Sequence, residues 1–354
     1  MRRANVLFLG DNCEHYESGY YHDDLLQGFR LLADTHAYGA GYPGYDPQDT
    51  IEDVIAKSPF DPAAIDLVVC GTAWGLNVSE PANFEERTHP RIRLDHLRIP
   101  KAYYLNKEYN CLDLKLEYAR RNRFDAVLTV HNRWEEWQRD LGVPFLYSPF
   151  GLNTARFEVA PRRRIHDVSF LGGLHKEWMD DRVWLKSTLF KPRHLHRKSN
   201  LGRENRFHLN VFQKPFHKLK IYWAEFGAVD RRGASLTPHG LRYAEILASS
   251  TSSFNTLSAV NIFNCRFFEL MHLGTLIVCP RTTLYPEFLR DGETCLMFDR
   301  SADDLWDKLR TVRENGALCA SIRETARATG AAYPHWRRAA DALAHFGFAS
   351  RPPA

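Results

Sequence analysis

The chain has 354 residues, of which 44% are hydrophobic and 25% are charged, ordinary proportions for a globular protein. The formal net charge of +4 does not by itself favour a nucleic-acid partner, although it suits an anionic substrate. No stretch approaches the roughly 20 apolar residues of a membrane helix, and the apolar run from Val6 to Leu9 is too short for a signal peptide. Seven cysteines without a Cys-x-x-Cys pair indicate a reduced, cytoplasmic protein without a zinc site.

Predicted strands and helices alternate through the first part of the chain. Strands are predicted at 5–10, 35–40, 65–70, 101–105, 126–130 and 144–147, and helices at 22–33, 50–58, 112–121 and 133–141. This alternation predicts an α/β fold with a doubly wound parallel sheet. The polar stretch 74–98 is either an acceptor loop or an insertion.

Titratable side chains follow several of these strands, where open parallel sheets bind ligands. They are the candidate general bases Asp11, His15, Glu108 and His131. Each also has a structural alternative. Asp11 can cap a turn, Glu108 can pair with Lys107 or a nearby arginine, and His131 can be a half-buried histidine with satisfied hydrogen bonds. The loop of His15 holds several other polar residues.

A chain of this length exceeds one ordinary core, so two domains are expected. Residues 149–157 read Pro-Phe-Gly-Leu-Asn-Thr-Ala-Arg-Phe, and a linker containing Pro and Arg follows at 160–164. We place the boundary there. The next strand, at 167–171, runs into Gly172-Gly173, and Lys176 and Arg182 come soon afterwards. Glycines let the backbone approach a phosphate closely, and these cations can neutralise it.

Residues 191–220 are rich in Lys, Arg and His, with interspersed phenylalanines. This composition suits either nucleic-acid contact or an exposed connection beside a packed strand, and we favour the connection. A strand is expected at 218–223, followed by a segment at 236–247 that contains Gly240 and Tyr243.

The stretch from Asn264 to Phe298 predicts a short helix, a buried strand, a loop and a second short strand. Asn264 can cap the helix and Gly274 can end it, and Pro280 stops the strand Thr275–Cys279. Arg266 and Glu269 lie three residues apart in this otherwise apolar helix, either as an exposed ion pair or as functional groups.

The C-terminal part predicts three helices. Ser301 and Asp304 form a capping-box pattern for a helix that ends near Asn315-Gly316. A second helix is expected at 321–329. The segment 333–346 would supply the last helix, with Trp336, Leu343 and Phe346 on its packing face.

The order of residues in the 264–298 stretch resembles the donor-binding segment of sugar-nucleotide-dependent glycosyltransferases with the GT-B fold, and is closest to the CgeB-like, spore-coat type group. The matching positions are Arg266, Phe268, Glu269, Gly274, the strand at 276–278, Glu287 and Asp291-Gly292. Residues 149–157 are similar to the interdomain segment of the same family, with Asn153 where Asp is common.

The resemblance implies two Rossmann-like, doubly wound domains facing a central cleft. Residues 1–157 would form the acceptor-side domain and 165–330 the nucleotide-sugar-binding domain, and 331–354 would form a helix that crosses back to the first domain. The implied reaction moves a sugar from a nucleotide-sugar to a hydroxyl of a glycan, a lipid-linked acceptor or a protein.

The resemblance also implies a donor-binding set. Its members are Gly172, Gly173, Lys176, Arg182, Tyr243, Asn264, Arg266 and Glu269. In the family the helix glutamate accepts hydrogen bonds from the nucleotide ribose, so we expect Glu269→Ala to weaken donor binding and leave stability nearly unchanged. No metal or cofactor is expected, because cations and helix N-termini can offset the diphosphate charge.

One departure concerns the stereochemistry. Many retaining relatives carry a second Glu eight positions before the ribose-binding one, and this chain has Asn261 there. Retention is therefore in doubt, and an inverting enzyme would need a general base. Two other hypotheses remain open: a glycosyltransferase that acts on a hydroxylated DNA base, and a non-catalytic protein that binds nucleotide-sugars or glycans.

Overall fold

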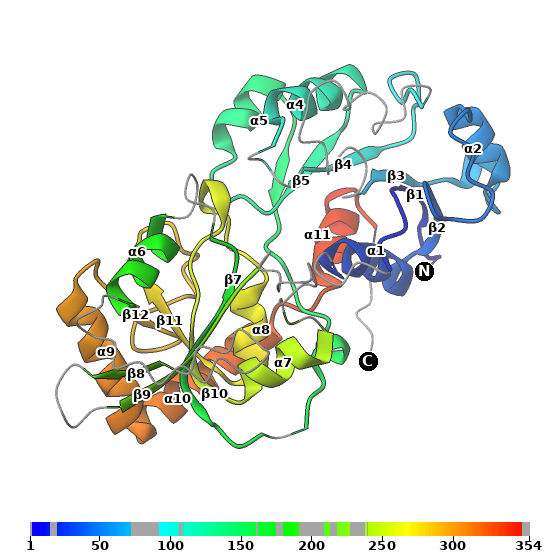
Figure 1. Ribbon diagram of the computed structural model, residues 1–354. Coiled ribbons are helices and arrows are strands. Elements are labelled where there is room, and N and C mark those ends of the chain that lie inside the picture. Colours follow the sequence, from blue (N-terminus) through cyan, green and yellow to red (C-terminus); the bar gives the residue numbers. More distant parts are fainter. Residues whose placement is uncertain are drawn as a thin grey trace, which may run out of the picture. The chain divides into compact units, whose positions relative to one another are not determined.

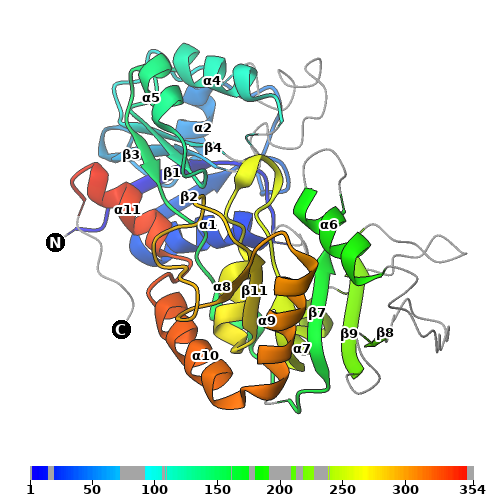
Figure 2. The same cartoon turned by 90° about the vertical axis from the view of Figure 1, so that its left-hand side faces the viewer.

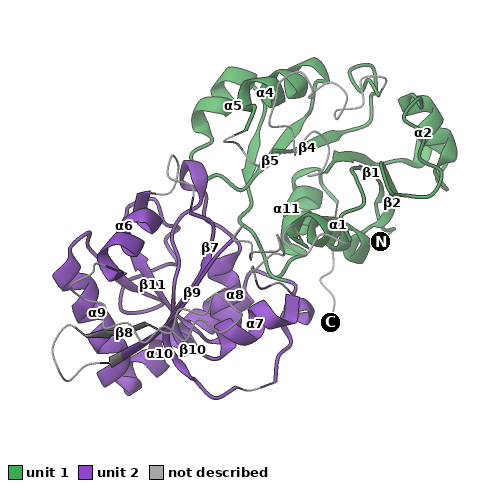
Figure 3. Ribbon diagram, in the orientation of Figure 1, with its two compact units in different colours: residues 1–152, 334–354 green, residues 153–333 purple. Residues whose placement is uncertain are grey.

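The computed structural model describes two compact units, which Figure 3 distinguishes by colour. Unit 1 comprises residues 1–152 and 334–354, and unit 2 comprises 153–333. The described residues are 2–14, 20–71, 92–105, 108, 110–160, 162–174, 180–190, 209–212, 218–226, 238 and 240–348. His15, Lys176, most of the predicted 74–98 loop and most of the basic 191–220 stretch lie outside them.

Unit 1 is built on a six-stranded parallel sheet in the order β2-β1-β3-β4-β5-β6. Its strands are β1 (Asn5–Leu9), β2 (Asp34–Tyr38), β3 (Leu67–Cys70), β4 (Lys101–Leu105), β5 (Ala126–Thr129) and β6 (Phe145–Tyr147). Its helices are α1 (Tyr20–Leu32), α2 (Ile51–Lys57), α4 (Leu112–Arg121), α5 (Glu135–Leu141) and α11 (Arg337–His345), with a 3-10 turn at Pro62–Ala64 (Figure 1).

Continuous burial of the central strands explains their sequences. Every residue of β3 and β4 is buried, as expected for strands covered on both faces. Helix α2 begins with a capping box. The Thr50 side chain accepts a hydrogen bond from the Asp53 amide, and the Thr50 amide donates one to the Asp53 carboxylate at 2.9 Å. Local signals and burial therefore agree in this unit.

The last helix, α11, packs against α1 within unit 1 (Figures 1 and 2). A Cβ on Gly28 would lie 3.0 Å from the Cα of Trp336 and 3.2 Å from the Cβ of Ala339, so the two helices approach closely at this glycine. Leu343 of α11 is buried, whereas Trp336 and Phe346 are half-buried. The chain thus returns to unit 1 after it leaves unit 2.

Unit 2 contains a second six-stranded sheet, in the order β12-β11-β10-β7-β9-β8. Its strands are β7 (His166–Gly172), β8 (Leu209–Phe212), β9 (Lys218–Glu225), β10 (Ser250–Phe254), β11 (Leu276–Pro280) and β12 (Leu296–Phe298). Its helices are α6 (Asp180–Leu189), α7 (Gly240–Ala248), α8 (Arg266–Leu273), α9 (Ala302–Glu314) and α10 (Gly316–Ala331), with 3-10 turns at Thr154–Phe157 and Ala259–Asn261.

The predicted α/β class is confirmed by both sheets, with specific differences in unit 2. The pairing of β8 with β9 is antiparallel, and neither β8 nor β10 was predicted as a strand. The helix predicted at 321–329 begins at Gly316, because Asn315 ends α9 and also caps α10 by accepting from the Leu318 amide at 3.1 Å. Pro280 belongs to β11 instead of following it.

The helix of the central stretch ends as predicted. Gly274 takes a left-handed conformation with φ 62° at the end of α8. Asn264 lies two residues before the first residue of α8, and its Oδ1 accepts from the Arg266 amide at 3.2 Å. Among the helices of the described residues, none is long and apolar enough to cross a membrane.

Candidate functional site

The strand order of unit 2 marks one edge of its sheet as a ligand site. The chain proceeds from β7 to β9 on one side and later returns to β10 on the other, so the winding reverses between β7 and β10. Open α/β sheets bind ligands at the carboxyl ends of the strands at such a point. Gly172 ends β7 there, and Thr256 lies just beyond the end of β10.

Arg182 of α6 is fixed at this edge. Its Nε donates to Oγ1 of Thr256 at 2.8 Å, and its Nη1 donates to the carbonyl oxygen of Gly173 at 3.0 Å. The side chain is buried, and this burial, assisted by the charge of Arg266, lowers its pKa to about 9. A buried guanidinium next to a second cation favours a negatively charged ligand.

Arg266, the first residue of α8, is that second cation. Its Nε donates to the hydroxyl of Tyr243 at 2.8 Å, and its guanidinium carbon lies 5.2 Å from the ring centroid of Phe226. Burial opposes its charge, but Tyr243 and Glu269 outweigh that effect and raise the pKa of Arg266 above its ordinary value. Arg266 therefore stays charged.

The two guanidiniums converge on Gly172. A Cβ built on this glycine would lie 3.0 Å from Nη1 of Arg266 and 3.3 Å from Nη1 of Arg182. Any larger residue would displace one of them. The structure thus brings together four predicted donor-site residues, namely Gly172, Gly173, Arg182 and Arg266.

Glu269 is buried, with 3% of its surface exposed, and its Oε2 accepts from the hydroxyl of Tyr243 at 2.5 Å. The interpretation of Arg266 and Glu269 as an exposed ion pair is therefore wrong. The contact also argues against the expectation that Glu269→Ala leaves stability nearly unchanged, because the carboxylate accepts from a buried tyrosine hydroxyl. Burial, together with the nearby Glu269 carboxylate, raises the pKa of Tyr243 well above its ordinary value, so its hydroxyl stays protonated and donates.

Asn264 orders the loop that connects β10 to α8. Its Nδ2 donates to the carbonyl oxygen of Thr256 at 2.7 Å, and its Oδ1 accepts from Asn255 at 3.2 Å. Thr256 thereby links Asn264 to Arg182. The sequence carried no signal for Thr256, because its importance depends on a partner 74 positions away.

The same loop contains two consecutive non-glycine residues in the left-handed region, Val260 with φ 49° and Asn261 with φ 65°. Asparagine tolerates this conformation, whereas a β-branched residue there is strained. Asn261, at the position that the sequence resemblance compares with a glutamate, is exposed on this strained turn.

In unit 1, two of the predicted bases share one hydroxyl. Oγ1 of Thr129 donates to Oε1 of Glu108 at 2.8 Å and accepts from the amide of His131 at 3.1 Å. Glu108 follows β4 and His131 follows β5, so the parallel pairing of these strands brings them together. Burial raises the pKa of Glu108 to about 7, against the opposing effects of its hydrogen bonds and of Lys115 and Arg338.

The geometry separates the base candidates. Nδ1 of His131 accepts from the amide of Arg133 at 3.0 Å, so the neutral ring carries its proton on Nε2. The lone pair on Nδ1 of neutral His131 is therefore engaged by this hydrogen bond and is not available to take a proton. Oε2 of Glu108 is buried and has no hydrogen-bond partner among the described residues. Asp11 follows β1 at a different part of the sheet, partly exposed, where its charge adds to burial in raising the pKa of Tyr45.

Arg338 of α11 is a residue that sequence reasoning missed. It is 3% exposed, and its guanidinium carbon lies 4.3 Å from the ring centroid of Tyr104 and 5.4 Å from that of Phe150. Its charge is one of those that act on Glu108. Only the return of the C-terminal segment to unit 1 could have revealed it.

Metal binding has no obvious place in the described part of the chain. Within it, no group of three or more His, Cys, Asp or Glu side chains is arranged to hold an ion. The expectation that catalysis needs no metal stays a prediction.

Comparisons with known proteins point in one direction. Residues 193–345 match a family model described as "Glycosyl transferase-like". No curated protein sequence matches the chain.

Solved structures resemble the chain over almost its whole length. HepE from Anabaena in complex with UDP-glucose shares 12% identity, with 97% of this chain and 100% of that chain covered and a TM-score of 0.57. A glycosyltransferase from Rickettsia africae shares 10% identity, with coverage of 98% and 99% and a TM-score of 0.57. The DNA-modifying enzyme β-glucosyltransferase shares 10% identity, with coverage of 96% of both chains and a TM-score of 0.51. At these identities the similarity shows the fold alone, and that fold is GT-B.

Proposed function

We propose that this chain, a nucleotide-sugar-dependent glycosyltransferase with the GT-B fold, binds the donor diphosphate between Arg182 and Arg266 of unit 2. The proposal starts from one observation, the convergence of these two guanidiniums on Gly172 at the carboxyl end of β7. Because the strand order reverses there, the site lies where α/β sheets bind phosphorylated ligands.

Two fixed guanidiniums suit the chemistry of the leaving group. Negative charge accumulates on the nucleoside diphosphate as the bond to the sugar breaks, and prepositioned cations stabilise that charge without reorganisation. Arg182 is held by Thr256 and Gly173, and Arg266 by Tyr243, so both are prepositioned. This arrangement supports transfer without a metal ion or cofactor.

We assign Glu269 to the nucleotide ribose. Tyr243 fixes the orientation of its carboxylate, and a carboxylate can accept from ribose hydroxyls. Gly173 and Asn264 complete the site by shaping the loops after β7 and β10. Lys176 keeps its predicted role on the diphosphate, although it lies outside the described residues.

We assign the general base to Glu108 of unit 1. Burial gives it a pKa of about 7, which suits proton abstraction near neutral pH. Its Oε2 has no competing hydrogen bond among the described residues, whereas the lone pair of His131 is engaged. Because Asn261 stands where the second glutamate would be, an inverting reaction that uses a general base such as Glu108 fits the residues present.

UDP-sugars are the first donors to test, because HepE was solved with UDP-glucose. We propose a glycan, a lipid-linked molecule or a protein as the acceptor, and kinship with the CgeB-like group because of the Arg266, Phe268 and Glu269 pattern. A cytoplasmic location is also proposed, since the seven cysteines of the sequence include no Cys-x-x-Cys pair.

The test is release of UDP from UDP-glucose and other UDP-sugars, to water and to a panel of oligosaccharide acceptors. Wild type should turn over, Arg266→Ala should lose donor affinity, and Glu108→Gln should retain donor affinity but lose turnover. Binding without turnover on any acceptor would support the non-catalytic hypothesis. Turnover only on hydroxymethylated DNA would support the DNA-modifying hypothesis, whose fold precedent is β-glucosyltransferase.

A further inference from the structure

A second cluster of cations lines a pocket at the opposite edge of the unit 2 sheet. Arg164 lies just before β7, Ala248 just before β10, and Leu273 and Gly274 just before β11, so this pocket borders the amino ends of the strands. Arg182 and Arg266 lie at the carboxyl ends of the same sheet. The two sites are therefore separate.

The pocket has two adjoining parts that share Arg164 and Arg327. The larger has a volume of about 730 Å³ and the smaller about 310 Å³. Such volumes accommodate a small phosphorylated molecule. The basic side chains that line the larger part are Arg162, Arg164, His272 and Arg327. The smaller part adds Gly274, Ala320, Arg323 and Glu324.

Arg164 is held in place by neutral groups. Its Nη1 donates to the carbonyl oxygen of Ser250 and, at 3.1 Å, to Oγ1 of Thr275, and its Nη2 donates to the carbonyl oxygen of Gly274 at 2.7 Å. Burial and the charges of Arg323 and Arg327 lower its pKa to about 10. The guanidinium is thus rigid, charged and repelled by its neighbours.

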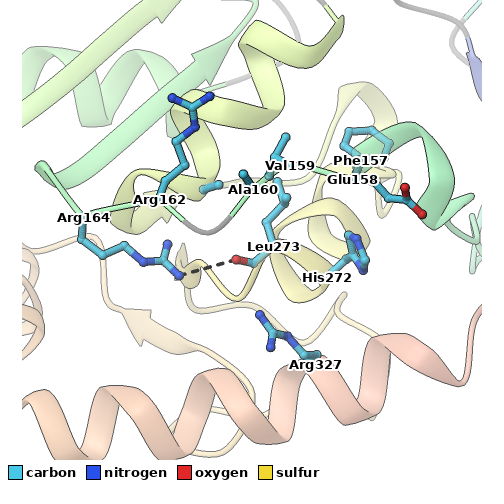
Figure 4. A pocket seen from close by; sticks show the side chains of 10 residues that line it. Phe157, Glu158, Val159, Ala160, Arg162, Arg164, His272, Leu273 and Arg327 are labelled. Atoms are coloured by element: carbon cyan, nitrogen blue, oxygen red, sulfur yellow. Dashed lines mark hydrogen bonds between the residues drawn. The ribbon is translucent and has the colours of Figure 1, made fainter.

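Arg323 and Arg327 come from one face of α10, four residues apart. A Cβ on Gly274 would lie 2.5 Å from Nη2 of Arg327, which places that guanidinium against the turn that Arg164 also contacts. Figure 4 shows Arg164 and Arg327 reaching toward Leu273 from two sides, while Arg162 extends away. Arg162 pairs with Glu245.

Three positively charged side chains, of which hydrogen bonds fix Arg164, line one pocket, and an anion bound among them would be stabilised by all three. Among the described residues, Arg164, Arg323 and Arg327 have no carboxylate oxygen within ion-pair distance, although Glu158 and Glu324 border the pocket. His272 also lines the larger part of the pocket, but burial and the charge of Arg327 lower its pKa, so it adds no positive charge near neutral pH. An anion would relieve this repulsion.

We propose that the pocket bordered by Arg164, Arg323 and Arg327 is a second binding site, specific for a phosphate group, at the edge of unit 2 away from the donor site. A phosphate offers oxygens to several guanidiniums at once, in the geometry that arginine prefers. The phosphate belongs either to a soluble phosphorylated compound or to a lipid headgroup.

The test titrates pyrophosphate into the Arg266→Ala protein by calorimetry, so that the donor site does not contribute. The Arg266→Ala protein should still bind pyrophosphate. Its affinity should fall about tenfold or more when Arg327→Ala or Arg323→Ala is added, because each change removes a charged donor from the pocket. Neither is among the buried residues of α10, and Arg313→Ala, an exposed arginine of α9 outside the pocket, is the matched control. Circular dichroism melting checks that each variant folds.

Sedimentation with phosphatidylcholine vesicles, with and without phosphatidylserine, distinguishes the sources of the phosphate. Binding to the anionic vesicles that requires Arg327 would assign the site to a lipid headgroup, and pyrophosphate binding alone would assign it to a soluble compound. Absence of pyrophosphate and vesicle binding up to about 10 mM ligand, or binding equally affected by Arg313→Ala, would overturn the proposal.

Discussion

The hydroxyl of Tyr243 donates to Oε2 of Glu269 at 2.5 Å, and the oxygen of that hydroxyl accepts from Nε of Arg266 at 2.8 Å. One tyrosine therefore connects the guanidinium assigned to the diphosphate with the carboxylate assigned to the ribose. Because Glu269 is buried, this connection has consequences for folding as well as for binding.

Tyr243→Phe should reveal both consequences. It removes the hydrogen bond from Tyr243 to a buried carboxylate, which should lower the free energy of unfolding by about 1–3 kcal/mol, and it frees Arg266 to move, which should weaken UDP binding. Urea denaturation and calorimetry measure the two effects. Glu269→Gln is the matched variant, since its amide oxygen still accepts from Tyr243, so it should lose affinity with a smaller loss of stability. Two variants indistinguishable from wild type would contradict the assigned contact.

Gly172→Ala should weaken donor binding by about tenfold, because its Cβ would come within 3.0 Å of Nη1 of Arg266. The effect should appear in the dissociation constant of UDP more than in the melting temperature, since a guanidinium can shift at lower cost than a strand. Gly316→Ala, where a Cβ would meet nothing within 4 Å, serves as the control. Unchanged UDP affinity in Gly172→Ala would show that the guanidiniums do not hold the donor.

Glu108 should make stability depend on pH. Its pKa is about 7 in the folded chain against an ordinary value of 4.5, so between these values the unfolded chain releases a proton that the folded chain keeps. The stabilisation that the protonated Glu108 side chain gives the folded chain is fully present below pH 4.5 and is lost as the pH rises through 7.

The resulting loss is about 3 kcal/mol, from the difference between 7 and 4.5 at about 1.4 kcal/mol per unit. Glu108→Gln lacks this titration, so its stability relative to wild type should rise by up to that amount between about pH 4.5 and about pH 8. Urea denaturation of both proteins at the two pH values measures it. A constant difference would show that Glu108 titrates normally. If Glu108 is the base, wild-type turnover should also rise with pH through about 7.

Because α11 packs closely on α1, Gly28→Ala should destabilise unit 1 by about 1–3 kcal/mol. The new Cβ would lie 3.0 Å from the Cα of Trp336, and this clash should outweigh the better helix propensity of alanine. Leu31→Ala, at a position of α1 that is 45% exposed, should change the unfolding midpoint much less. Equal effects would indicate that α11 does not pack at Gly28.

The sequence predicted most strands through burial on both faces, which leaves continuous apolar runs such as 67–70 and 276–278. It missed β10, whose sequence is Ser-Thr-Ser-Ser-Phe, because its polar side chains are satisfied by partners outside the strand, two of them on β7. Oγ of Ser252 donates to the carbonyl oxygen of Asp167 at 2.9 Å, and Oγ of Ser253 to that of Ser169 at 3.1 Å. A polar strand of this kind cannot be recognised without its partners.

The candidate site shows the same limit. The resemblance singled out Arg266 and Glu269 by their spacing on one helix, but the contact that unites them passes through Tyr243, which lies 26 positions from Glu269. Thr256 and Arg338 likewise act through residues distant in sequence. Local patterns identified the residue types, and only the fold could pair them.

The central claim is that Arg182 and Arg266 bind a nucleoside diphosphate, and a thermal-shift screen tests it most directly. Wild type and Arg266→Ala are heated with UDP, GDP, CDP, ADP and dTDP and their common sugars, without metal and then with magnesium. A ligand at about 100 times its dissociation constant stabilises the folded state by about 2.7 kcal/mol. One nucleotide that raises the wild-type melting temperature equally with and without magnesium, and has little effect on Arg266→Ala, is the predicted result. No response from any nucleotide, or the same response in both proteins, would contradict it.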